Sequence, residues 1–115
     1  MGGVSHPADS SVPSVGPGDV PPSVTLLDVR EDDEWAAGHA PDAVHLSMST
    51  LTGRLDELPA GPLAVICRSG GRSARVTAYL AGQGRDAVNV DGGMLAWEAE
   101  GRPMAGGGPD GPRVA

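Results

Sequence analysis

The 115-residue sequence has no phenylalanine, no lysine and a single cysteine, and aromatic residues make up only 3% of it. A core must therefore be built mainly from valine, leucine, alanine and methionine. One cysteine excludes an intramolecular disulfide and a cysteine-rich zinc site, and it is typical of a reducing compartment. No run approaches the roughly 18 apolar residues of a membrane span, and the first residues lack the pattern of a secretion signal. We expect a cytoplasmic protein that does not insert into membranes.

Positive charge is also scarce. Arginine supplies all eight cations against 15 acidic residues, which gives a net charge of -7. This balance argues against nucleic acid as a partner. The histidines show no spacing of metal ligands, so neither a metal nor a cofactor is predicted: His6, His39 and His45. The densest arginine run, Arg68, Arg72 and Arg75, surrounds the only cysteine, Cys67. A local anion site is expected there.

The chain is organised as one domain with loose ends. Residues 1–11 are small and polar and residues 105–115 are rich in glycine and proline, so both are expected to be flexible tails around a domain at 12–104. Within the domain, predicted strands at 23–29, 44–46, 61–66 and 86–90 alternate with predicted helices. This alternation predicts an α/β fold, with a parallel sheet that helices cover on both faces.

The sequence "CRSGGRS" connects the predicted strand at 61–66 to a helix that begins near Ser73. Gly70 and Gly71 can adopt positive φ, which lets successive backbone N–H groups turn inward as an anion-binding nest. The nest and the helix N-terminus favour a thiolate at Cys67 and make it a candidate nucleophile. The competing interpretation is a small buried side chain that closes a strand, but packing alone requires neither the two glycines nor the two arginines.

The loop also predicts a substrate site. Planar guanidinium groups suit an oxyanion, so Arg68 and Arg72 are expected to bind an anionic donor, whereas Arg75 lies one turn into the helix and is expected at the surface. The complete predicted substrate-binding set is Arg68, Ser69, Gly70, Gly71, Arg72 and Ser73.

Three motifs together resemble single-domain rhodaneses from about residue 12 to 103: "LLDVREDDEWAAGHAPDAVHL", "CRSGGRSA" and "VNVDGGMLAWEAEGRP". The resemblance implies a five-stranded parallel sheet with its first strand near "VPSV", and a sulfurtransferase that works through a Cys67 persulfide. It implies thiosulfate or a similar sulfane-sulfur donor as substrate, with cyanide as the assay acceptor. Asp28 and Arg30 match the family's Asp-Val-Arg, and we interpret them as a structural ion pair that could also shape the pocket.

One feature departs from the family. A helix usually precedes the Asp-Val-Arg strand, but "GPGDVPPS" contains too much proline and glycine to form one.

Two alternative functions remain. Relatives that act as Cys-dependent phosphatases or arsenate reductases have one more residue in the loop, whereas here four residues separate Cys67 from Arg72. A non-catalytic binding module is the other alternative, although inactive relatives usually lose the cysteine. If the chain is a sulfurtransferase, the lack of a second cysteine requires an external acceptor, either a small thiol or a partner protein.

Overall fold

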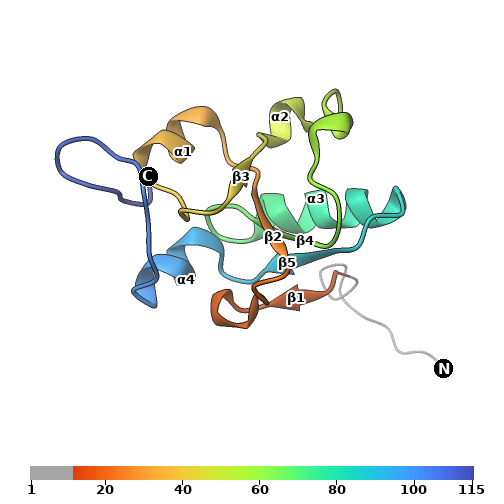
Figure 1. Ribbon diagram of the computed structural model, residues 1–115, viewed down its shortest axis with the longest axis horizontal. Helices are drawn as coiled ribbons and strands as arrows, with labels where there is room; N and C mark the ends of the chain where they lie inside the picture. The colour runs from red at the N-terminus through yellow and green to blue at the C-terminus, as the bar shows by residue number, and fades with distance from the viewer. Residues whose placement is uncertain (1–11) are drawn as a thin grey trace.

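The computed structural model describes residues 12–115, and its centre is a five-stranded sheet in the order β1-β5-β4-β2-β3. All neighbouring strands are parallel. The strands are β1 (Ser14–Val15), β2 (Thr25–Asp28), β3 (Val44–His45), β4 (Leu63–Ile66) and β5 (Ala87–Val90). The helices are α1 (Asp32–Ala37), α2 (Met48–Leu51), α3 (Gly71–Gly82) and α4 (Gly93–Ala99), with 3-10 turns η2 (Pro17–Asp19) and η3 (Leu55–Glu57). Figure 1 shows the alternation of strands and helices along the chain.

Two apolar clusters lie on opposite faces of the sheet. One joins β2 and β4 to α2 and α3, through side chains that include Leu51, Val76 and Leu80. The other joins β2, β4 and β5 to α4 through Met94, with Trp97 packed against it. The expected α/β fold with a five-stranded parallel sheet and helices on both faces is therefore confirmed.

Strand β4 is buried along its whole length, which explains its uninterrupted apolar sequence. Successive side chains of a strand point to opposite faces. Leu63 and Val65 accordingly lie in the cluster with α3, and Ala64 and Ile66 lie in the other. Cys67 continues the odd-numbered series, so its side chain faces the beginning of α3.

The segment between β1 and β2 contains η2, a 3-10 turn of three residues, and no α-helix. The expected departure from the family pattern is confirmed. Prolines in this segment border a cavity of about 460 Å³, which Ala40–Ala43 and Trp97 also line. None of the predicted site residues borders this cavity.

Residues 105–115 make more contacts than their glycine and proline content led us to expect. Ala105 and His39 exchange backbone hydrogen bonds, and Gly107 and Arg113 donate to carbonyls at the end of α1. Figure 1 shows the dark blue loop of this segment beside α1. The predicted loose tail is thus tied to α1 in the structure, whereas the tail predicted for residues 1–11 lies outside the described residues.

Within residues 12–115, no helix combines the length and the apolar character that are needed to cross a membrane.

Candidate active site

Cys67 lies where β4 passes into α3, and its sulfur faces the first turn of that helix. The Gly70 N–H donates a hydrogen bond to Cys67 Sγ at 3.1 Å, and the Ser73 hydroxyl lies 3.2 Å from it. Gly70 caps α3 with a φ of 109°, a left-handed conformation that glycine adopts without strain. The expected positive φ is therefore present at Gly70, where it turns the loop so that the Gly70 N–H points at the sulfur, but it is absent at Gly71, which is already the first residue of α3.

These contacts control the ionisation of the thiol. Burial raises the pKa of Cys67, since only 1% of the residue is exposed. Hydrogen bonds from the Ser73 hydroxyl and from the N–H groups of Ser73, Gly70 and Ser69 oppose this effect, and the net pKa is lower than that of an ordinary thiol. A buried cysteine with a lowered pKa is a candidate nucleophile rather than an inert packing residue.

The Ser73 hydroxyl has a second neighbour, which the sequence did not reveal. Its oxygen lies 2.5 Å from Asn89 Oδ1 on β5, and both side chains are buried. A hydroxyl has one proton, so Ser73 donates either to the sulfur or to the Asn89 amide oxygen. Asn89 is therefore part of the environment that sets the thiolate fraction of Cys67.

Helix α4 fixes the outer side of the loop. The Met94 N–H donates to the Cys67 carbonyl at 2.8 Å, and the Leu95 N–H donates to the Arg68 carbonyl at 3.0 Å. This approach requires a glycine at position 93, because a Cβ there would lie 2.5 Å from the Cys67 carbonyl oxygen. These two hydrogen bonds hold the Cys67 and Arg68 carbonyls against α4, while the Gly70 N–H faces the sulfur.

Arg72 does not project freely beside the sulfur. Its Nη1 and Nη2 donate to the two carboxylate oxygens of Glu34 in α1, at 2.7 and 2.8 Å. The pair is mostly buried, with 26% of the Arg72 side chain and 17% of the Glu34 side chain exposed. Sequence reasoning missed Glu34, because 38 residues separate the two side chains and no spacing pattern links them.

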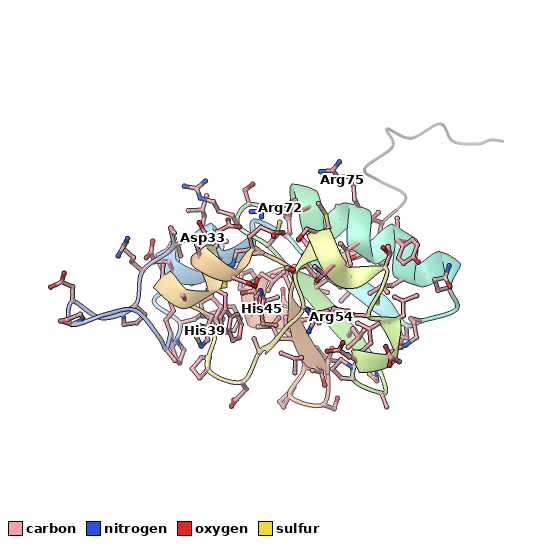
Figure 2. All side chains as sticks on the ribbon, turned by 90° about the horizontal axis from the view of Figure 1, so that it is seen from above. Asp33, His39, His45, Arg54, Arg72 and Arg75 are labelled. Atoms are coloured by element: carbon pink, nitrogen blue, oxygen red, sulfur yellow. The ribbon has the colours of Figure 1, made fainter. Side chains whose placement is uncertain are left out.

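The other loop residues lie at the surface. Arg68 is exposed, and its Nε donates to an oxygen of Ala115, the last residue of the sequence, at 2.9 Å. Ser69 is also exposed, as is Gly71. Arg75 points outward from α3 (Figure 2), as its position one turn into the helix predicted.

Asp28 and Arg30 form the expected ion pair, which is entirely buried. Arg30 donates to both carboxylate oxygens of Asp28 and also to the Gly38 carbonyl at 2.7 Å. Asp28 follows Leu27 in β2, so its side chain points to the face opposite that of Leu27 and Cys67. The pair thus ties the end of β2 to the end of α1, the helix that carries Glu34.

Two histidines near this pair, His39 and His45, pack against the Trp35 ring. His39 stacks on Trp35 with ring centroids 3.6 Å apart, and its Nδ1 lies 2.7 Å from the Trp35 carbonyl oxygen. His45 stacks on the same indole at 4.8 Å. The stacking explains how the turn that follows α1 is held.

Comparison with known proteins supports the reading of the three motifs. The model of the rhodanese-like domain family matches residues 18–100, which include the whole Cys67 loop and α4. The chain belongs to the rhodanese-like family.

Curated relatives of this rhodanese-like domain have sulfurtransferase names. Over 79 residues it is 49% identical to YtwF of Bacillus subtilis, a protein named provisionally as a sulfurtransferase, and the match covers 68% of this chain and 77% of YtwF. It is 43% identical over 83 residues to a sulfurtransferase of Allochromatium vinosum, covering 70% of this chain and 78% of the relative.

Solved structures agree with the fold. The crystal structure of a rhodanese-like domain protein from Staphylococcus aureus superposes with a TM-score of 0.68 at 36% identity, covering 75% of this chain and 91% of the other. A rhodanese-related protein from Thermoplasma volcanium has the same TM-score of 0.68 at 35% identity, covering 71% and 83%.

Proposed function

We propose that the protein is a sulfurtransferase whose Cys67 carries the transferred sulfur as a persulfide. The observation that supports this most directly is the set of hydrogen-bond donors around Cys67 Sγ, from Gly70 and Ser73, at the N-terminus of α3. The sulfurtransferase names of the relatives support the same reaction class.

The first half-reaction uses thiosulfate or a similar sulfane-sulfur donor. The Cys67 thiolate attacks the outer sulfur of thiosulfate, the S–S bond of the donor breaks, and sulfite leaves with the bonding electron pair. The product is a Cys67 persulfide anion. The N–H groups of Ser69, Gly70 and Ser73, which lower the pKa of the Cys67 thiol, would stabilise this anion in the same way.

The second half-reaction needs an acceptor from outside the chain, because Cys67 is the only cysteine. In an assay, cyanide attacks the outer sulfur of the persulfide, thiocyanate forms and the Cys67 thiolate is restored. In the cell we expect a small thiol or a partner protein to be the acceptor.

Thiocyanate formation from thiosulfate and cyanide tests the proposal. Initial rates with both substrates varied should give the parallel double-reciprocal lines of a ping-pong mechanism. Cys67→Ser should form no thiocyanate while keeping the wild-type unfolding transition. An active Ser variant would exclude Cys67 as the carrier. Cys67-dependent hydrolysis of an aryl phosphate that exceeded sulfur transfer would instead indicate the phosphatase alternative.

A further inference from the structure

We propose that Glu34 determines donor specificity at Cys67. By pairing with Arg72 it cancels the charge of this loop arginine, so the site discriminates against dianionic donors such as thiosulfate relative to monoanionic ones. The inference rests on the proposed sulfurtransferase function. It adds a residue from another element, α1, to a site that the loop sequence alone appeared to define.

The geometry shows how completely Arg72 is engaged. Two N–H groups on one edge of its guanidinium meet both oxygens of Glu34, at 2.7 and 2.8 Å. A planar guanidinium binds a carboxylate and a sulfonate oxygen pair through the same fork, so one edge cannot bind both at once. A donor must either displace Glu34 or do without that edge.

Glu34 is also held in place independently of Arg72. It is the third residue of α1, where its Oε1 accepts a hydrogen bond from the Glu31 N–H at 3.0 Å, as part of a capping box. Its pKa is lowered to about 2, mainly by the hydrogen bond from Arg72. The carboxylate is therefore fully charged at any pH at which the thiolate reacts.

The consequence for the site is electrostatic. An ion pair whose charges sum to zero attracts an anion much less than a free arginine does, and the difference grows with the charge of the anion. The second loop arginine is engaged as well, since the Arg68 Nε donates to an oxygen of Ala115, the last residue of the sequence. The site is thus suited to a donor with one negative charge more than to one with two.

Thiosulfate and methanethiosulfonate form a matched donor pair for the test. In the second compound a methyl group replaces one oxygen anion, so it carries one negative charge less. In both reactions the Cys67 thiolate takes the outer sulfur, the S–S bond breaks, and sulfite or methanesulfinate leaves with the electron pair. The ratio of kcat/KM for the two donors isolates the effect of donor charge.

Glu34→Gln should raise the thiosulfate to methanethiosulfonate ratio by about tenfold, the effect of roughly one unit charge a few ångströms away in a partly buried site. Glutamine can keep the capping hydrogen bond, so α1 should remain folded. An unchanged or lower ratio would overturn the proposal, because it would mean that Glu34 only positions Arg72.

Two control variants remove the same charge elsewhere. Glu57→Gln breaks an exposed two-pronged pair, with Arg54, which has N–O distances of 2.8 and 2.9 Å and lies apart from Arg72 (Figure 2). Asp33→Asn neutralises the exposed acid next to Glu34, which accepts a hydrogen bond from the Glu34 N–H and forms no ion pair among residues 12–115. Neither should change the ratio by more than about twofold. An equal rise in either control would also overturn the proposal.

Alkylation gives a readout that does not depend on sulfur transfer. Iodoacetate and iodoacetamide both react with the Cys67 thiolate and release iodide, but only iodoacetate is an anion, and their rate ratio cancels the thiolate fraction and the accessibility of the sulfur. Glu34→Gln should raise the ratio of the iodoacetate rate to the iodoacetamide rate several-fold. The two reagents differ by one negative charge, as the two sulfur donors do, so the two ratios should rise by similar factors. If the wild type used neither donor, the proposed function would fall, and an unchanged alkylation ratio would reject the role of Glu34 separately.

Discussion

At the scale of single residues, the Ser73 hydroxyl is the contact that most directly controls Cys67. It lies 3.2 Å from the sulfur and 2.5 Å from Asn89 Oδ1, so the two acceptors share one proton. When Cys67 is a thiol, Ser73 can donate to Asn89. When Cys67 is a thiolate, donation to the sulfur stabilises the charge, which is why this bond lowers the pKa of Cys67.

Ser73→Ala should therefore raise the pKa of Cys67. A hydrogen bond to a charged group contributes roughly 1.5–3 kcal/mol, so the shift should be about one to two pH units. Iodoacetamide alkylation rates followed across pH measure the thiolate fraction. The wild-type curve should lie at lower pH than that of denatured protein. The Ser73→Ala curve should lie about one to two pH units above the wild-type curve.

Ser47→Ala is the matched control for this variant. Ser47 is also buried, but its hydroxyl contacts Ser49 and Thr50 and not the sulfur. Its alkylation curve should coincide with the wild-type curve. If the Cys67 of the folded wild-type protein titrated at or above the denatured control, the loop would not stabilise a thiolate. Cys67 would then be a buried packing residue.

The site residues that could be predicted from the sequence are those that lie close to one another in the chain. Cys67, Gly70 and Ser73 are close in sequence, so strand, loop and helix N-terminus follow from local patterns. Glu34 and Asn89 could not be found in this way, because they reach the loop from α1 and β5 through the tertiary fold. From the sequence alone, the polar side chains of Glu34 and Asn89 could equally well have been exposed to solvent.

At the scale of elements, the "DGG" turn leads from β5 into α4 and brings the start of that helix against the Cys67 loop. Gly93 has a φ of 57°, and a Cβ there would lie 2.5 and 2.6 Å from the carbonyl oxygens of Cys67 and Arg68. Both obstacles are backbone atoms, which cannot rotate away as a side chain could. The sequence showed this segment only as a turn, since the approach of α4 to the loop is a tertiary contact.

Gly93→Ala should destabilise the fold by about 1–3 kcal/mol through backbone strain and weaken sulfur transfer as the loop carbonyls shift. Urea unfolding measures the first effect and thiocyanate formation the second. Gly82→Ala is the control with the opposite sign, because position 82 ends α3 in open space without a positive φ. It should stabilise the protein by roughly 0.4–1 kcal/mol. Equal effects of the two variants would show that α4 does not press on the loop.

At the scale of the whole molecule, the order of strands and helices could be predicted, whereas the connections between distant segments could not. Apolar strands alternating with helices define a parallel sheet with both faces covered, and the structure has that sheet. The course of residues 105–115 along α1 depends on backbone hydrogen bonds, which composition does not encode. The glycine and proline content of residues 105–115 predicted a flexible segment, whereas the structure shows that this segment contacts α1.

The whole fold brings the thiol, the ring of donors and the Glu34–Arg72 pair to the carboxyl end of the sheet, where open α/β sheets bind their ligands. In this setting we expect Cys67 to carry a sulfur atom. Intact-mass spectrometry of the protein after incubation with thiosulfate or methanethiosulfonate tests it directly. We predict a gain of one sulfur atom, located at Cys67, absent from Cys67→Ser and removed by cyanide with release of thiocyanate. No gain in mass with either donor, or an adduct that cyanide does not remove, would show that Cys67 does not carry the transferred sulfur.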